Sequence, residues 1–362
     1  METSFYISTT NVDGGIRLSV DDMEKFMQLI GSSFAFKKSR TSEPDKGCRI
    51  PDLNSYIASF LVDIELGRRV TNKGKRYSKG TIQCIRQTIN KFREYQNWKG
   101  EKLNFNDIDL DFYRDYTAFL MQHNYSINSI GKCIKKLKQI LLNAYEEGFP
   151  VNPAVRGKGF KVYSVKSDAI YLTKEELDAM EETDLSGFPE SYSIARDIFM
   201  IGVWTTQRVS DYNNLRKENI VGTSTLSIRL TQKKTGKRVI IPCCSKLRGI
   251  IDKYPDNLPH LYDQKINKLI KEIGRMAGID EIVETSSTKG GIPSKIYLPK
   301  WQLIQTHTAR RTGATLMYLS GMDVYDICKI TGHSSIQNLE RYIKANELET
   351  ARKLTENYAF FK

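Results

Sequence analysis

Apolar residues recur every three to four positions in four stretches between residues 49 and 150. The rhythm is clearest through Ile82, Ile85 and Ile89, and Gly148 gives a stop signal after the last stretch. This spacing turns one apolar stripe of each helix toward a shared core, so a compact helical bundle is predicted. Its helices are expected at 55–67, 78–98, 108–123 and 126–147.

The pattern changes at residues 151–172, a stretch with proline, glycine and several basic residues that we interpret as a linker. Thr173 and Glu176 then match a capping box, which opens a mostly helical domain over 173–362. Its exception is 221–242, where alternating β-branched residues flank a Lys-Thr-Gly-Lys turn typical of a β-hairpin. We therefore predict a mainly α, multidomain chain, with a helical domain at 49–150 and an α+β domain after the linker.

Residues 1–48 have the weakest pattern and form a separate N-terminal segment in this interpretation. A short helix is predicted over 19–30, where Ser19 and Asp22 could cap its first turn. The polar stretch 39–47 carries glycine and proline and is typical of a linker.

The net charge of +13 over 362 residues favours a polyanionic partner, most simply a nucleic acid. No apolar run approaches the roughly 18 residues that span a bilayer, and the first residues lack the pattern of a signal peptide. No amphipathic basic helix stands at a terminus, so a membrane surface is a weaker choice of partner. We expect a soluble, cytoplasmic protein.

Two clusters of basic residues lie in the predicted bundle, and either could be a solvated face or a set of phosphate contacts. We favour phosphate contacts, because like charges repel and their crowding needs a reason. The candidate DNA-binding residues are Arg68, Arg69, Lys73, Lys75, Arg76, Lys79, Lys132, Lys135 and Lys136, with Lys138 nearby.

The chain has six cysteines, but they form no C-x-x-C pair and none has zinc-ligand spacing from a histidine. Cys84, Cys133 and Cys328 lie in helical apolar patterns, so we expect buried free thiols in a reducing compartment. The sequence contains neither a Walker A run nor G-x-G-x-x-G, and no nucleotide cofactor is expected.

Four segments of the second domain hold an unusual set of polar residues. They are T-T-Q-R-V-S-D with Arg208 and Asp211, Q-K-K-T-G-K with Lys234, H-T-A-R with His307 and Arg310, and T-G-H with His333, nine residues before Tyr342. Each segment alone has an ordinary structural explanation. The remaining two histidines, His123 and His260, lie in turn-like contexts and are interpreted as structural.

The order Arg, Lys, His-x-x-Arg, Gly-His and Tyr resembles that of the tyrosine recombinases, the phage integrase family. The resemblance covers the second domain, and the preceding bundle looks like the SAM-like core-binding domain of integrases from bacterial mobile elements. It implies that Arg208, Lys234, His307, Arg310, His333 and Tyr342 are catalytic. The chain departs from the family pattern where Thr206 replaces a common glycine and where Asp211 replaces a frequent glutamate.

Phosphodiester chemistry supports the same assignments. Two arginines can hold the nonbridging oxygens, and imidazoles can donate hydrogen bonds or move protons. Tyr342 would attack, in a cationic pocket that should favour its phenolate, and the phosphotyrosine would conserve the bond energy without ATP. Lys234 would protonate the leaving 5′ oxygen; Lys233 competes, but Lys234 directly precedes Thr-Gly. No metal is expected, because the surrounding side chains are cations.

The resemblance also implies an assembly. Four strand cuts require four subunits, so we expect a monomer in free solution and a homotetramer on paired double-stranded DNA, with accessory DNA-bending proteins as further candidate partners. The two domains would form a C-shaped clamp around the duplex, and the first 48 residues leave room only for a reduced arm-binding region. The apolar stripe of Leu348, Ala351, Leu354 and Tyr358 could pack on its own domain or on a neighbouring protomer.

Two other functions use similar residues. A type IB topoisomerase would share the Arg, Lys, His and Tyr chemistry but relax supercoils as a monomer, and the N-terminal bundle favours the recombinase. A DNA-binding protein that has lost catalysis is disfavoured, because all six catalytic positions are present. Integration, excision, inversion and dimer resolution are not distinguished by these motifs.

Overall fold

The fold is that of a computed structural model, which describes residues 10–12, 15–17, 51–166, 168–222 and 225–358. The chain separates into two units, Met1–Pro51 and Asp52–Lys362. In the first, β1 (Thr10–Val12) pairs antiparallel with β2 (Gly15–Arg17). The helix expected at 19–30, the linker expected at 39–47 and Cys48 lie outside the described residues.

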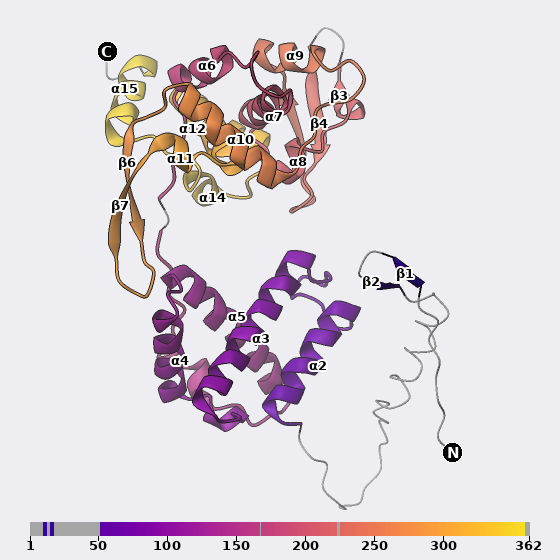
Figure 1. Cartoon of the computed structure of the whole chain (residues 1–362), viewed down its shortest axis with the longest axis vertical. Helices are drawn as coiled ribbons and strands as arrows, with labels where there is room; N and C mark the ends of the chain where they lie inside the picture. Colours follow the sequence, from indigo (N-terminus) through magenta and orange to yellow (C-terminus); the bar gives the residue numbers. More distant parts are fainter. Residues whose placement is uncertain (1–9, 13–14, 18–50, 167, 223–224, 359–362) are drawn as a thin grey trace, which may run out of the picture. The chain divides into compact units, whose positions relative to one another are not determined.

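The second unit begins with the predicted helices: α2 (Leu53–Leu66), α3 (Lys79–Lys99), α4 (Leu110–Gln122) and α5 (Ile127–Glu146), drawn in purple in Figure 1. Each begins where a short polar side chain accepts a main-chain N–H of the first turn, and Ser78 does so for α3. The ends of α2 and α3 fall at Gly67 and Gly100, whose φ angles of 77° and 74° suit glycine. Local capping thus sets the boundaries that the apolar rhythm predicted.

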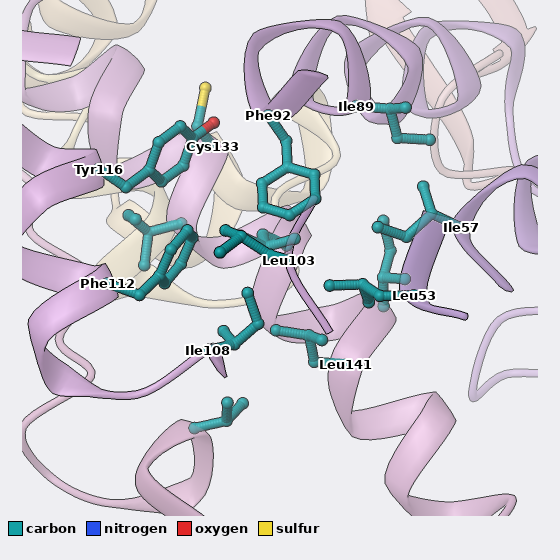
Figure 2. Close-up of a cluster of buried hydrophobic side chains, with 14 of the residues drawn as sticks. Leu53, Ile57, Ile89, Phe92, Leu103, Ile108, Phe112, Tyr116, Cys133 and Leu141 are labelled. Carbon is teal, nitrogen blue, oxygen red and sulfur yellow. The ribbon is translucent and has the colours of Figure 1, made fainter. Parts of the chain in front are cut away.

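The core of the bundle lies where the apolar stripes of these helices meet. Figure 2 shows Leu53 and Ile57 of α2, Phe92 of α3, Phe112 of α4 and Leu141 of α5 converging on one cluster. The rings of Phe92 and Phe112 meet edge to face, with their centroids 5.9 Å apart. Burial of these side chains supplies the main stabilisation of this part of the chain.

The middle of the linker is fixed on α5. The side-chain amide of Asn128 donates to the carbonyl of Val165 and accepts its N–H, both at 2.9 Å. The carbonyl of Tyr163 lies so close to Gly131 that a Cβ there would be 1.9 Å from it. Only glycine permits this contact, so Gly131 allows the linker to pack directly against α5.

The rest of the unit is built around three helices, α7 (Ser191–Thr205), α10 (Asp263–Met276) and α12 (Thr306–Leu319). α7 carries buried residues on every face and contacts both of the others. A Cβ at Gly313 of α12 would lie 2.2 Å from the carbonyl oxygen of Val203, so the two helices cross closely. This crossing brings the end of α7 next to Arg310 on α12.

The remaining helices are shorter and surround this centre. Thr173 and Glu176 form the predicted capping box at the start of α6. The elements are α6 (Lys174–Glu182), α8 (Val209–Tyr212), α9 (Ser245–Asp252), α11 (Lys300–Leu303), α13 (Val324–Thr331), α14 (Ile336–Glu340) and α15 (Glu347–Asn357), with 3₁₀ turns at Phe105–Asp107, Pro153–Arg156 and Lys217–Asn219.

The predicted hairpin is present as β4 (Ser227–Thr231) and β5 (Arg238–Pro242), and β3 (Ile220–Val221) adds a third strand. The prediction that 221–242 is the only strand region of the domain was wrong. A second antiparallel hairpin, β6 (Ile282–Ser287) and β7 (Ser294–Pro299), lies in the orange segment of Figure 1. Its strands bury almost no side chains, so they lack the apolar alternation that reveals a strand on a core.

The free thiols follow the expectation only in part. Cys133 is buried, whereas Cys84 and Cys328 are half-buried, because both lie toward the edges of their helices' packed faces. Among the described residues, no helix is long and apolar enough to cross a membrane.

Candidate active site

The end of α7 prepares the first arginine. Thr206 follows the helix in the left-handed region, with a φ of 54°, where a β-branched residue is strained and glycine would be at ease. This conformation explains why glycine is common at this position of the pattern. The reversal turns the Thr206 carbonyl toward Arg310 and places Arg208 at the N-cap of α8.

Arg310 is the most enclosed charge of the site, with no exposed surface. Its guanidinium donates to the carbonyls of Thr206 and Thr331, both at 2.8 Å. Burial, followed by repulsion from Arg208, lowers its pKa to about 10, so it stays protonated at neutral pH. Its Nε is buried without a hydrogen-bond partner among the described residues. The pocket therefore holds a fixed positive charge, and the Nε–H of Arg310 is an unused hydrogen-bond donor among the described residues.

His333 lies directly against this arginine. Nη2 of Arg310 is 3.0 Å from Nε2 of His333, and Nδ1 of His333 is 2.8 Å from Oγ1 of Thr331. Because arginine only donates, Nε2 must accept, so the proton is on Nδ1 and is donated to Thr331. Thr331 in turn donates to the carbonyl of Ile327 at 2.6 Å. Burial, then the charge of Arg310, lowers the pKa of His333 to about 3, which keeps the imidazole neutral.

Tyr342 lies in the turn that follows α14, and its N–H donates to the carbonyl of Leu339 at 2.7 Å. Its ring centroid is 4.6 Å from that of His333 and 5.3 Å from that of His307. The guanidinium carbon of Arg310 lies 5.1 Å from the same ring. Tyr342 is therefore surrounded by three of the predicted catalytic residues, although it comes from a different element from each of them.

His307 and Arg310 lie one turn apart on α12 and share its face toward the pocket. Burial, and after it the nearby charges of Arg311, Arg310, Arg208 and Lys234, together lower the pKa of His307 to about 4. Lys234 thus lies within electrostatic range of the site, on the exposed turn between β4 and β5. The structure brings together all six predicted residues, with Lys234 as the most exposed.

Two buried glutamines outside the predicted set, Gln207 and Gln232, connect these segments. The side-chain amide of Gln232 donates to Gln207 Oε1 at 2.7 Å and to the carbonyl of Thr331 at 2.8 Å. Its Oε1 accepts from Thr235 at 2.7 Å and from Arg208 at 3.4 Å. Gln232 therefore joins the turn that carries Lys234, the first arginine and the segment before His333. A polar residue directly before K-K-T-G was the only available signal in the sequence.

Asp211 and Lys237 position the same turn. Oδ1 of Asp211 accepts the N–H of Lys233 at 2.8 Å, and its Oδ2 is buried without a partner among the described residues. The Lys237 ammonium donates to the carbonyl of His333 at 3.2 Å. The carboxylate that replaces glutamate in the motif thus holds the main chain beside Lys233 and Lys234, while both lysine side chains stay exposed.

Within the described ranges, no three His, Cys, Asp or Glu side chains gather in a way that could hold a metal ion. His123 and His260, interpreted as structural, bond the main-chain carbonyls of Phe119 and Asn213.

The sequence profile of the phage integrase SAM-like domain matches residues 66–156, and that of the phage integrase family matches residues 171–349. The chain belongs to the phage integrase family. It is a tyrosine recombinase, an enzyme of site-specific DNA strand exchange, and its two matched regions contain helices α3 to α5 of the bundle and the pocket around Tyr342. A comparison with curated proteins gives no match.

Solved structures of other recombinases share the fold of this integrase at low identity. A lambda integrase tetramer bound to a Holliday junction is 16% identical with a TM-score of 0.58, over 91% of this chain and 88% of that one. XerH site-specific recombinase bound to difH substrate is 14% identical with a TM-score of 0.58, over 89% and 100%. The Tn1549 transposon integrase in complex with transposon right end DNA is 14% identical with a TM-score of 0.58, over 85% and 100%.

The predicted DNA-binding cations differ in their contacts and exposure. Arg69 pairs with Asp63 and Glu147, and its guanidinium lies 4.9 Å from the ring centroid of Phe60. These contacts indicate that Arg69 stabilises the fold. Arg68 also pairs with Asp63, at 3.5 Å. Lys136 is half-buried beside Gln139, 3.0 Å away. The exposed side chains are Lys73, Lys75, Arg76, Lys79, Lys132 and Lys135, together with Arg68, which is exposed despite its ion pair.

Proposed function

We propose that this integrase cleaves and rejoins DNA through a covalent 3′-phosphotyrosine at Tyr342. The phenolic oxygen would attack the scissile phosphorus, a new P–O bond to tyrosine would form, and the bond to the 5′ oxygen would break. In the return step, a 5′-hydroxyl of the partner strand attacks the phosphotyrosine and releases Tyr342. The energy of the broken bond is conserved, so rejoining requires no ATP.

One observation carries this proposal: the Tyr342 ring lies close to two imidazoles and to a buried guanidinium. Arg208 and Arg310 would hold the nonbridging oxygens, where negative charge increases as the phosphorus becomes five-coordinate. A neutral His307 can accept the phenolic proton, and its pKa of about 4 leaves it unprotonated near neutral pH.

Lys234 is proposed as the acid that protonates the leaving 5′ oxygen. Its turn is anchored by Asp211 and by Gln232, so its ammonium group can reach the pocket without being buried in it. Lys233 is the competing acid because it lies in the same turn. Among the neighbouring lysines, Lys237 is engaged with the carbonyl of His333.

A nicked suicide substrate tests the nucleophile directly. Cleavage near the nick releases a short oligonucleotide, so the strand cannot be rejoined and the covalent protein–DNA adduct accumulates. We expect the intact protein to form this adduct and Tyr342→Phe to form none while binding the same DNA. Adduct formation by Tyr342→Phe would contradict the proposal. Relaxation of plasmids without any preferred site would instead favour the topoisomerase.

The assembly is also proposed: a monomer when free and a homotetramer on paired DNA sites, aided by accessory DNA-bending proteins. Support comes from α15, which is tethered to its own domain by polar contacts yet keeps Leu348 74% exposed. Glu349 accepts a hydrogen bond from Tyr171, and the Lys353 ammonium lies 3.6 Å from the ring centroid of Tyr318. The exposed edge of the helix is then free for a neighbouring protomer. A stable tetramer in ultracentrifugation without DNA would contradict this.

We propose the domain limits 49–150, 151–172 and 173–362 and a cytoplasmic location.

We also propose that the exposed cations of the first domain contact the DNA backbone. Each phosphate contact that is lost should reduce the slope of log affinity against log salt by about 1. Lys132→Gln and Lys135→Gln should therefore weaken binding similarly on all sequences. An unchanged salt slope would remove these two residues from the interface.

A further inference from the structure

A cavity of about 420 Å³ is lined in part by Arg311 and Lys344, which lie next to Arg310 and Tyr342 along the chain. It is lined by the end of the linker, by β6 and by the segments that carry two catalytic residues. Arg311 directly follows Arg310, and Lys344 lies two residues after Tyr342. Lys166 completes the set of cations around the cavity. None of the six catalytic assignments uses these three side chains.

Lys166, Arg311 and Lys344 make no ion pair among the residues that the structure describes, although Asp168 lies within electrostatic range of both lysines. The cavity also contains Asp168 and Glu284, but both carboxylates are engaged on the hairpin. Asp168 accepts the N–H and the hydroxyl of Ser286, both at 2.6 Å. Glu284 pairs with Lys295 at 2.8 Å. The unengaged charge in the cavity is therefore positive.

Holding these positive charges close together is energetically unfavourable in the absence of an anion. Lys344 and Arg311 are both half-buried. Burial lowers the pKa of Lys344, and repulsion from Arg311 and Lys166 lowers it further. Burial also lowers the pKa of Arg311. Charged groups that are partly removed from water and repel one another are stabilised when an anion binds between them.

We propose that this cavity holds a second backbone phosphate of the cleaved DNA strand, within two linkages of the phosphate that Tyr342 attacks. The inference rests on the proposed function, since it requires the scissile phosphate to lie at Arg310 and Tyr342. Successive phosphates of one strand rise by only about 3.4 Å along the duplex axis, so a neighbouring phosphate must lie close to the first. A planar guanidinium with an adjacent ammonium suits its nonbridging oxygens.

The second phosphate would act through position. A strand held at the scissile phosphate and at a second phosphate nearby cannot rotate away from the line of attack. Arg311 and Lys344 are therefore positioning residues, and their effect should depend on the charge of one particular linkage. This dependence separates a phosphate contact from a merely structural role.

The test uses the intact chain and suicide duplexes in which one linkage near the cut is a neutral methylphosphonate. Each of the two linkages on either side of the cut is replaced in turn, and the rate of covalent adduct formation is measured. For the wild-type protein we expect a loss of about 10-fold at one of these linkages, the size of one charge-assisted hydrogen bond. Arg311→Gln and Lys344→Gln should be slower on unmodified DNA but insensitive to that same replacement.

Arg352→Gln is the matched control, because it removes one exposed arginine of α15 at the surface of the same domain. It should retain the wild-type rate and the wild-type sensitivity. Thermal unfolding of each variant identifies loss of folding, and Lys344→Gln keeps the test valid if Arg311→Gln unfolds. If both variants stay as sensitive as the wild type at every linkage, the cavity does not bind a phosphate. Failure of the wild type itself to form an adduct would instead overturn the proposed function.

Discussion

Nη2 of Arg310 donates to Nε2 of His333 across 3.0 Å, and this contact fixes the protonation state of the imidazole. The ring cannot accept a second proton while the buried guanidinium occupies Nε2. His333 is therefore a neutral hydrogen-bonding group in this state, and proton transfer near neutral pH falls to His307 or Lys234. In complex with DNA, Arg310 could turn toward the phosphate only if His333 found another donor.

The first prediction concerns stability against pH. The pKa of His333 falls from an ordinary 6.5 to about 3 on folding. Between pH 6.5 and 3, His333 is therefore protonated in the unfolded chain but not in the folded chain. The free energy of unfolding decreases as the pH falls through this range. This histidine alone should cost about 1.4 kcal/mol at pH 5.5 relative to pH 7.5. Urea unfolding at both pH values measures the difference, and His333→Gln should reduce it; an equal loss in the variant would refute the assignment.

The second prediction concerns Gln232, which is fully buried. Gln232→Ala removes the donor to the Thr331 carbonyl and the acceptor for Thr235 and Arg208. Each buried group left without a partner costs about 1–3 kcal/mol, so the free energy of unfolding should fall by that order. Adduct formation should slow even on saturating DNA, because Arg208 and the Lys234 turn lose their shared anchor.

The matched control for that experiment is Gln139→Ala, which removes a half-buried glutamine from the bundle, outside the pocket. It should leave the rate of adduct formation at saturating DNA unchanged. If Gln232→Ala cleaves saturating DNA at the wild-type rate, Gln232 has no part in positioning the site.

The six candidate catalytic residues could be proposed from the sequence because each lies in a short motif that resembles the family pattern. His307 and Arg310 share one helix face, and His333 and Tyr342 are separated by one short helix. The hydrogen-bond network around Gln232 could not be predicted in the same way. Gln232 meets Thr331, 99 residues later, through a contact that depends on how two elements pack.

The fold shows the same division. The bundle helices were predictable because local capping residues such as Ser78 and Gly100 coincide with the ends of apolar stripes. The β6–β7 hairpin was missed, since Tyr297 and Ile282 are about 60% exposed and no buried face imposes a two-residue period. Arg69 shows another limit of the sequence: its place in a basic cluster suggested DNA, and its pairing with Glu147, 78 residues away, could not be predicted from local pattern.

The third prediction concerns the exposed edge of α15. Leu348→Ser should leave the thermal unfolding midpoint unchanged, because Leu348 is 74% exposed in the monomer. If that leucine docks on a neighbouring protomer, strand exchange between two duplexes should fall several-fold while adduct formation at a single site persists. Thr355→Ser, which conserves the exposed hydroxyl on the same helix, is the control. Unchanged strand exchange by Leu348→Ser would show that this edge is not an interface.

The fourth prediction identifies the acid that protonates the leaving group. An alkoxide leaves slowly unless it is protonated, whereas a thiolate, with a thiol pKa near 8.5, leaves without help. A substrate with sulfur in place of the bridging 5′ oxygen should therefore restore adduct formation by Lys234→Ala to nearly the wild-type rate. On ordinary DNA the same variant should be about 100-fold slower or more.

Lys233→Ala and Lys237→Ala make this experiment selective. Both lysines lie in or next to the same turn, but Lys237 contacts the carbonyl of His333, so its loss should slow cleavage of the oxygen and sulfur substrates alike. Rescue by sulfur is expected for the general acid alone, because only that residue acts on the leaving atom. If the sulfur substrate rescues Lys233→Ala and leaves Lys234→Ala inactive, the proton comes from Lys233. The preference for the lysine before Thr-Gly would then be wrong.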